Sequence, residues 1–253
     1  MNVPMQSDLE KKINILNNMI KESNKIVFFG GAGVSTASGI PDFRSKDGLY
    51  NQHNVQFEKY QPEYLLDRHC LYCNPKVFYE FYRQKMDTRD IKPNITHYKL
   101  AELEKLGKLK AIVTQNIDGL HQKAGSKNVI EIHGTTQKCY CTKCKKEFPY
   151  DYIFNSTDAI PKCECGGMIR PDVTLYSEPL PVKASNDAYN AIATADMLIV
   201  AGTSLAVYPA AGMIDYFTGK YLVLINKGNV DKAIYTDLFI DGDMTEVFKL
   251  ITV

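Results

Sequence analysis

Apolar runs of strand length alternate with amphipathic stretches along most of the chain. Residues 7–24 repeat their apolar side chains three and four positions apart, which predicts an amphipathic helix capped by Ser7 or Asp8. Residues 26–29 form a short apolar run that ends in glycines, which predicts a buried strand followed by a tight turn and a helix. This order is typical of a nucleotide-binding βα unit.

The same alternation returns in later parts of the chain. We predict further helices at residues 95–106, 188–195 and 209–217, and further strands at residues 110–114, 129–132, 197–201 and 221–225. Strands that alternate with helices pair in parallel, with helices on both faces of the sheet. The fold class is therefore α/β, with a Rossmann-like doubly wound parallel sheet.

A cysteine cluster interrupts this pattern. The chain has seven cysteines, an odd number, and five lie between Cys139 and Cys165, which suits metal ligation better than a disulfide framework. Two closely spaced pairs are separated by residues 145–162, a spacing typical of a tetrahedral zinc site. We predict one structural zinc with the ligands Cys141, Cys144, Cys163 and Cys165. Cys139 is a competing ligand, and the Cys70 and Cys73 pair is unassigned.

A second interruption at residues 50–86 is rich in tyrosine and predicts short helices. We therefore divide the chain into a Rossmann-like nucleotide-binding domain and a small domain. The first comprises residues 1–49, 87–137 and 172–253, and the second combines the helical insertion 50–86 with the zinc-binding module 138–171.

Composition narrows the class of protein without identifying it. The 253 residues are 45% hydrophobic and 23% charged, as in ordinary globular proteins. The formal net charge of +1 gives no reason to expect steering toward nucleic acid or an anionic membrane. The first 22 residues lack the apolar run of a signal peptide, and no apolar stretch reaches the roughly 20 residues of a membrane helix. We expect a cytoplasmic protein without a membrane partner, and the sequence predicts no oligomeric state.

The glycine turn after residues 26–29 carries the first candidate chemistry. Gly31 and Gly33 would let the backbone approach a pyrophosphate, and free amides would bind its charge. Thr36 stands where a third glycine is usual, so a tight turn without a ligand is an equal alternative on this pattern alone. The loop beyond it adds the ring of Phe43 and the cation of Arg44.

Polar residues also follow two of the predicted strands. Gln115, Asn116 and Asp118 come directly after residues 110–114, and His133 comes after residues 129–132. Open α/β sheets bind ligands at the carboxyl ends of their strands, and an imidazole there can act as a general base. Taken singly, these residues also fit turn chemistry and a structural histidine.

Four segments resemble the signatures of the sirtuin family, in the family's order. They are the glycine loop at residues 31–44, the segment 114–121, the dipeptide His133–Gly134, and the segment 202–205 followed by Pro209 and Ala210. The resemblance implies an NAD-dependent protein-lysine deacylase, which moves the acyl group from lysine to ADP-ribose and releases nicotinamide.

The resemblance also implies the residue roles. His133 is the general base, Asn116 orients the nicotinamide end, Gln115 contacts a ribose, and Asp118 binds the nicotinamide carboxamide together with Ile117. Phe43 would shield the reactive ribose carbon from water. The remaining implied NAD contacts are Ala32, Thr36, Arg44, Thr203, Ser204, Asn226, Asp243 and Met244.

Residues 170–178 are similar to the family segment that pairs with an acylated peptide. Thr174, Leu175 and Tyr176 would line the acyl-lysine channel, while Ser177 stands where the family has glycine. Members that prefer succinyl-lysine or malonyl-lysine carry Tyr-x-x-Arg, and the matching place here is Tyr82 to Lys85. Lysine lacks the bidentate fork of arginine, so we expect an acetyl or another uncharged acyl group.

Two rival functions remain open at this point. A protein mono-ADP-ribosyltransferase or NAD hydrolase would use the same fold and the same dinucleotide. A zinc-ribbon nucleic-acid-binding module would instead use the lysines of the cysteine cluster, namely Lys138, Lys143, Lys145 and Lys146. The near-neutral net charge argues against nucleic acid as a partner.

Overall fold

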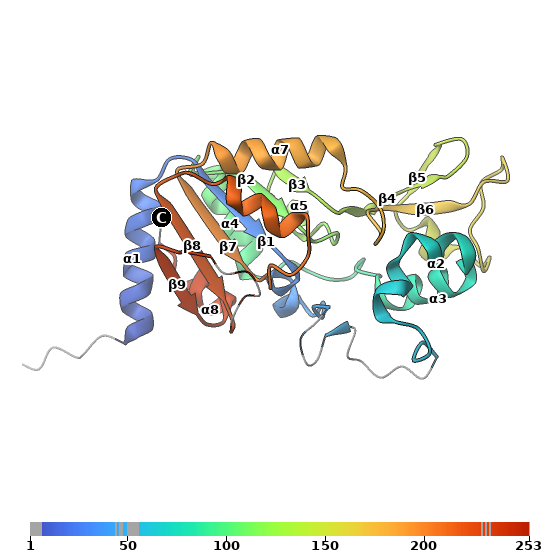
Figure 1. Cartoon of the computed structure of the whole chain (residues 1–253), viewed down its shortest axis with the longest axis horizontal. Helices are drawn as coiled ribbons and strands as arrows, with labels where there is room; N and C mark the ends of the chain where they lie inside the picture. The colour runs from blue at the N-terminus through green and yellow to red at the C-terminus, as the bar shows by residue number, and fades with distance from the viewer. Residues whose placement is uncertain are drawn as a thin grey trace, which may run out of the picture.

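The larger of two lobes is built around a six-stranded parallel sheet (Figure 1). The computed structural model describes residues 7–43, 45, 48–49, 56–228, 230, 232 and 234–252. The strands of the sheet are β1 (Ile26–Gly30), β2 (Leu109–Thr114), β3 (Val129–Glu131), β7 (Met197–Ala201), β8 (Tyr221–Asn226) and β9 (Leu238–Asp241). Their order is β3-β2-β1-β7-β8-β9, and every neighbouring pair is parallel. The order reverses between β1 and β7, as in a doubly wound fold. The predicted fold class is confirmed.

Helices cover both faces of this sheet because its strands are apolar on both sides. In β1, Ile26 and Phe28 pack in one core with α1 (Asp8–Glu22), α4 (Ile95–Lys105) and α8 (Met244–Lys249). Val27 and Phe29 point to the other core, with α7 (Val182–Ala193) and the 3₁₀ helix η5 (Ala210–Tyr216). The capping box of Ser7 and Glu10 starts α1 where the sequence predicts it.

The smaller lobe joins the helical insertion to the cysteine-rich module (Figure 1). Its helices are η4 (Pro62–Leu66), α2 (Arg68–Cys73), α3 (Pro75–Lys85) and α6 (Tyr152–Asn155). Its antiparallel sheet has the order β5-β4-β6, with β4 (Gly134–Cys141), β5 (Glu147–Pro149) and β6 (Ile169–Val173). One shared core fills the lobe. The predicted domain limits at 137/138 and 171/172 fall inside β4 and β6, and the division stays a prediction.

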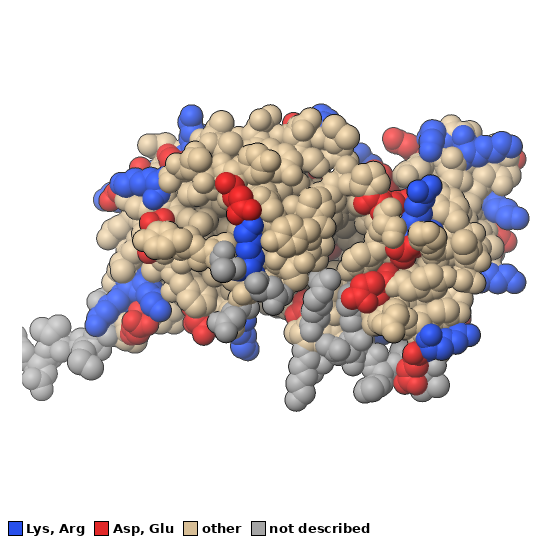
Figure 2. Space-filling model, in the orientation of Figure 1, with Lys and Arg blue, Asp and Glu red and all other residues tan. Residues whose placement is uncertain are grey.

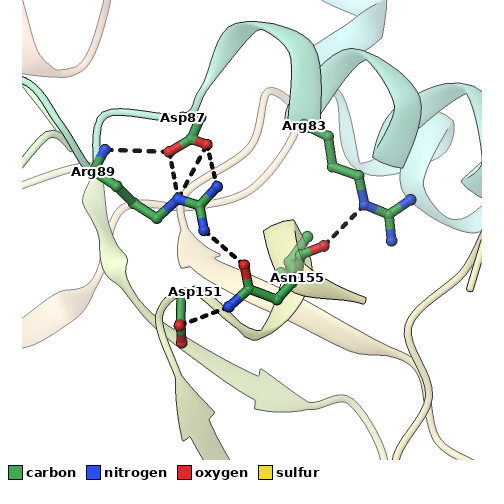
Figure 3. A network of polar contacts seen from close by, with 6 residues as sticks. Arg83, Asp87, Arg89, Asp151 and Asn155 are labelled. Carbon is green, nitrogen blue, oxygen red and sulfur yellow. Dashed lines mark hydrogen bonds and ion pairs between the residues drawn. The ribbon is translucent and has the colours of Figure 1, made fainter. Parts of the chain in front are cut away.

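Arginine contacts fasten α3 to the cysteine-rich module (Figure 3). Arg83 Nε donates to the carbonyl of Ile153 at 2.9 Å. Arg83 Nη2 also donates to the carbonyl of Asp158 at 2.7 Å. Arg89 Nη1 donates to Asn155 Oδ1 at 2.7 Å, while Arg89 Nη2 pairs with Asp87 at 2.6 Å. These contacts join the helical insertion and the segment after it to the cysteine-rich module.

Several elements differ from the sequence prediction. Helix α7 begins at Val182, not at 188, and the predicted helix 209–217 is the 3₁₀ helix η5. The sequence did not predict α5 (Leu120–Lys123), α8, β9 or the small antiparallel sheet, all of them short or polar. Within the described residues, the structure has no helix that combines the length and the apolar character needed to cross a bilayer.

Candidate active site

A cavity of about 680 Å³ opens at the carboxyl end of the six-stranded sheet, against the small lobe. Its volume lies within the roughly 300–1,000 Å³ typical of ligand sites. Among the residues assigned from the sequence to catalysis, NAD or the acylated substrate, those that line the cavity are Ala32, Thr36, Phe43, Gln115, Asn116, Ile117, Asp118, His133, Thr174, Leu175, Tyr176, Thr203, Ser204, Asn226, Asp243 and Met244. The remaining one, Arg44, lies outside the described residues.

The loop after β1 packs backbone to backbone against the loop after β7. The Gly33 amide donates to the Gly202 carbonyl at 2.9 Å, and a Cβ on Gly33 would lie 2.8 Å from Gly202 Cα. Gly202 has a φ of +60°, and a Cβ there would lie 2.6 Å from Val34 N. Both glycines are therefore required for the two loops to meet at the sheet's switch point.

The prediction of a helix directly after the glycine turn was wrong. Residues there form two short 3₁₀ helices, η1 (Ala32–Val34) and η2 (Thr36–Ser38). Gly39, with a φ of +94°, ends the second, and Pro41 follows it. The Thr36 hydroxyl, in place of a third glycine, donates to the Gly33 carbonyl at 3.0 Å. The amides available to a pyrophosphate are those of a tight turn and not of an α-helix.

Ser35 connects this turn to the loop after β2. Its hydroxyl donates to Asp118 Oδ2 at 2.6 Å, and Asn116 Nδ2 donates to Ser35 Oγ at 3.1 Å. Asp118 Oδ1 accepts from the Leu120 amide at 2.9 Å. Burial raises the pKa of Asp118, and the bonds from Ser35 and Leu120 oppose that shift only in part. Ser35 was missing from the predicted site, although it lies within the signature at residues 31–44.

His133 lies where β3 ends and β4 begins, at the junction of the two lobes. Its Nδ1 is 2.9 Å from the Gln115 carbonyl oxygen. A carbonyl only accepts, so Nδ1 carries the proton and Nε2 is left with its lone pair. Burial lowers the pKa of His133, and the bond to Gln115 offsets this in part. The imidazole is therefore neutral near pH 7 and able to accept a proton at Nε2.

Five of the remaining implied NAD contacts lie at or just beyond the carboxyl ends of β7, β8 and β9, namely Thr203, Ser204, Asn226, Asp243 and Met244. Thr203 Oγ1 accepts from Gln115 Nε2 at 3.0 Å, which ties the loop after β7 to the loop after β2. Asp243 caps α8 and accepts from the Thr245 amide at 2.8 Å. Hydrogen bonds from the Thr245 side chain and amide lower the pKa of Asp243 despite partial burial. Its carboxylate is thus already engaged in capping the first turn of α8.

The segment after β6 lies beside His133. The Thr174 amide donates to the His133 carbonyl at 2.8 Å. On the other side, the Tyr176 amide donates to the Leu66 carbonyl at 3.0 Å, and the Arg68 amide donates to the Tyr176 carbonyl at 3.1 Å. The predicted substrate segment is therefore fastened between the predicted base and the helical insertion.

Two side chains of α3 also line the cavity. Tyr82 is 1% exposed, stacks between Phe78 and Phe154, and has a hydroxyl for which the described structure holds no hydrogen-bond partner. Burial raises the pKa of Tyr82, so it stays neutral. Lys85 lines the same cavity one helical turn further on. These are the positions that the sequence singled out for acyl preference.

The predicted cysteines come together in the small lobe. The sulfurs of Cys141, Cys144, Cys163 and Cys165 all lie within 4.8 Å of one another. The Cys141 and Cys165 sulfurs are 3.5 Å apart, and those of Cys144 and Cys163 are 3.7 Å apart. A tetrahedral zinc with bonds of about 2.3 Å would hold its sulfurs about 3.8 Å apart, so the set fits zinc. Cys139 instead approaches the Pro149 carbonyl at 3.0 Å and stands outside the set.

The lysines of the cysteine-rich module are exposed but mixed with other groups. Figure 2 shows Lys and Arg atoms around the outer end of the small lobe, with Asp and Glu atoms among them. Lys146 pairs with Glu164 at 3.5 Å, and Lys145 lies 5.3 Å from the ring centre of Tyr140. This surface gives little support to a nucleic-acid-binding module.

Comparison with known proteins agrees with the site. The model of the Sir2 family matches residues 31–209. A Clostridium acetobutylicum protein named NAD-dependent protein deacetylase is 52% identical over 241 residues, covering 95% of this chain and 98% of that protein. A Clostridium perfringens protein of the same name is 51% identical over 242 residues, covering 94% and 98%.

Solved structures show the same likeness. A Sir2 structure with a p53 peptide and NAD+ has a TM-score of 0.82 at 37% identity and covers 94% of this chain and 95% of its own. A Sir2 structure bound to acetylated peptide has a TM-score of 0.82 at 34% identity, with the same coverage. On the family match and on relatives aligned over nearly their whole length, this chain belongs to the Sir2 family, the sirtuins that its four signatures resemble.

Proposed function

We propose that this protein is an NAD-dependent protein-lysine deacetylase, which transfers the acyl group of an acyl-lysine to ADP-ribose and releases nicotinamide. The observation that carries the proposal is the bond from the Thr174 amide to the His133 carbonyl. It joins the predicted substrate segment to the predicted base in the cavity that Asn116 and Asp118 also line. The deacetylases of similar sequence support the same function.

Bound NAD supplies a labile bond between nicotinamide and its ribose. Asp118 and Ile117 bind the nicotinamide carboxamide, and Asn116 orients that end of the molecule. The bonds through Ser35 hold Asn116 and Asp118 in place before NAD arrives. Gln115 contacts a ribose while its Nε2 stays bonded to Thr203.

His133 is the general base. Because its Nδ1 is bonded to the Gln115 carbonyl, Nε2 would accept the proton of a ribose hydroxyl of bound NAD. The acyl oxygen would take the place of nicotinamide on the ribose carbon, the hydroxyl would then attack the acyl carbon, and the lysine amine would leave. The lowered pKa of His133 keeps the free imidazole neutral and ready for this step. Phe43 lines the cavity and packs against the small-lobe core, where it excludes water from the reacting carbon.

We infer that the acyl-lysine of the substrate lies in the cavity against the side chains of Thr174, Leu175 and Tyr176, because the amides of all three residues are already bonded within the protein. This segment follows β6 and is anchored at both ends by backbone hydrogen bonds.

One zinc ion, held by the four cysteines, is structural. Four thiolates close its shell and leave no position for water, so the metal orders the small lobe and takes no part in the reaction. Thiolate ligands persist in a reducing compartment, and the similar deacetylases come from bacteria, which supports the cytoplasm as the site of action.

Product analysis tests the proposal. The protein is incubated with NAD and a panel of acylated peptides, and every product is identified by mass, with His133→Ala as the control. The expected products are nicotinamide, acyl-ADP-ribose and the free-lysine peptide, lost in the variant. ADP-ribose attached to protein, or free ADP-ribose without acyl transfer, would instead identify an ADP-ribosyltransferase or an NAD hydrolase.

A further inference from the structure

The substrate segment ends in a turn that is held from the protein interior. The Glu178 amide donates to the Leu175 carbonyl at 3.1 Å and closes the turn. The Glu178 carboxylate accepts from Arg170 at 2.6 and 2.9 Å and from the Leu175 amide at 3.0 Å. Arg170 is only 5% exposed. This buried pair fixes the inner side of the turn.

The outer side of the turn is strained. Ser177, its third residue, has a φ of +66°, whereas Tyr176 before it is not among the residues with positive φ. A turn of this kind favours glycine at its third position, because a Cβ disfavours left-handed backbone. The described structure has only three non-glycine residues in this region, the others being Lys145 and Leu205. Something outside the turn must therefore hold Ser177 in place.

Asp67 supplies that hold. Its Oδ2 accepts from the Ser177 hydroxyl at 2.5 Å, across 110 positions of sequence. The Asp67 side chain is 13% exposed, and its Oδ1 caps α2 by accepting from the His69 amide at 2.6 Å. The bonds of Leu66 and Arg68 to Tyr176 bracket it on both sides. Asp67 itself is not among the residues that line the cavity.

The charge state of Asp67 suits this arrangement. Partial burial alone would raise the pKa of Asp67, but the hydrogen bonds from Ser177 and His69 outweigh it, and the pKa lies below its usual range. The carboxylate is therefore ionised at neutral pH, and a charged acceptor makes the stronger hydrogen bond.

We propose that Asp67 is a positioning residue for substrate recognition, which holds Ser177 in its left-handed conformation and thereby fixes the path of Thr174 to Tyr176 beside the acylated peptide. The inference rests on the proposed deacetylase function and adds to it a residue outside the cavity. Asp67 acts through Ser177 and Tyr176, and it contacts neither NAD nor the acylated peptide.

The test is a double-mutant cycle between Asp67→Ser and Ser177→Gly. Serine at position 67 keeps a hydroxyl that can cap α2 but is too short to reach Ser177. Glycine at position 177 adopts a positive φ without help, so Asp67 should matter less in that background. The measured quantities are KM for an acetyl-lysine peptide, KM for NAD, and hydrogen exchange of the amides of residues 175–178.

Asp67→Ser should raise the peptide KM about fivefold when residue 177 is serine and less than about twofold when it is glycine, with the KM for NAD changed little. Exchange of the turn amides should rise in the same pattern. Equal effects in both backgrounds, or no change in peptide KM, would overturn the positioning role. Failure of the proposed function is a separate outcome. It would be seen in the unaltered protein alone, which would then transfer no acyl group to ADP-ribose from any peptide.

Discussion

The Ser35 hydroxyl donates a 2.6 Å hydrogen bond to Asp118 Oδ2 and so joins the loop after β1 to the loop after β2. The Ser35 hydroxyl oxygen also accepts from Asn116 Nδ2 at 3.1 Å. The two strands are neighbours in the sheet, so their loops emerge side by side at its carboxyl end. The side chains proposed to hold nicotinamide are thus fixed by the fold and not assembled by the ligand.

Removal of this connection should weaken the use of NAD. Ser35→Ala leaves the buried Asp118 carboxylate with one hydrogen bond fewer and frees the Asn116 amide. We expect kcat/KM for NAD to fall about tenfold, because a bond to a charged, buried group is lost. Steady-state kinetics with saturating acetyl-lysine peptide measure the change.

Ser126→Ala is the matched control. Ser126 is also buried, at 5% exposure, but the described structure holds no hydrogen-bond partner for its hydroxyl. Its removal should change kcat/KM for NAD by less than about twofold, since no bond is lost. Similar losses in both variants would mean that buried hydroxyls matter here only for folding.

The acidic limb of the pH profile should report His133. Burial lowers the pKa of His133 below its usual value of 6.5. The base works only when neutral, so activity is full above this pKa and is lost as the pH falls through it. We expect kcat/KM for the acetyl peptide to be level at pH 7 and to decline with a midpoint below 6.5. A midpoint above 6.5 would contradict the neutral, buried imidazole.

The central sheet could be predicted from the sequence because its strands are buried on both faces. Every residue of Met197–Ala201 is buried, and the continuous apolar run marks the strand at both ends. β9 was missed because it has four residues at the edge of the sheet, with burial that alternates along it. β4 was missed because polar residues fill its middle and because its pairing with β6 shifts register between Thr135 and Cys139, so burial does not alternate along it.

The candidate site also has a part that the sequence predicts and a part that it does not. The family signatures locate Gly33, Asp118 and His133, each of which lies within four residues of the end of a strand, whereas the local pattern alone left a turn or a structural histidine open. The link from Asp67 to Ser177 has no local signature, because 110 residues separate its partners and only the packed small lobe brings them together. The sequence showed that Ser177 replaces a glycine, but not which residue supports it.

Loss of zinc should increase hydrogen exchange in the cysteine-rich module and also in α3, which lines the cavity. Cys165→Ser removes one of four ligands, and metal affinity should fall sharply. Arg83 connects the module to α3, whose Tyr82 and Lys85 line the cavity. We expect lower zinc content and faster hydrogen exchange in β4, β6 and α3, with α1 and α7 unchanged.

The control is Cys73→Ser, which alters an exposed cysteine on α2 outside the four-cysteine group. It should retain zinc and show normal exchange in α3. Exchange in α3 that is unaffected by zinc loss would show that the contacts of Arg83 do not transmit order from the module to the cavity.

Acyl preference should follow from the cation at position 85. Tyr82 offers a buried hydroxyl with no partner in the described structure, and Lys85 lines the same cavity. An ammonium is a point charge and cannot grip a carboxylate with two parallel bonds, so acetyl peptide should be turned over about tenfold faster than succinyl peptide. Lys85→Arg supplies the planar fork and should lower the ratio of acetyl-peptide to succinyl-peptide turnover.

Lys76→Arg, on the exposed side of the same helix, is the control and should not change this ratio. Kinetics with the two peptides at equal concentration decide the matter, and faster turnover of succinyl peptide by the unaltered protein would show that lysine suffices.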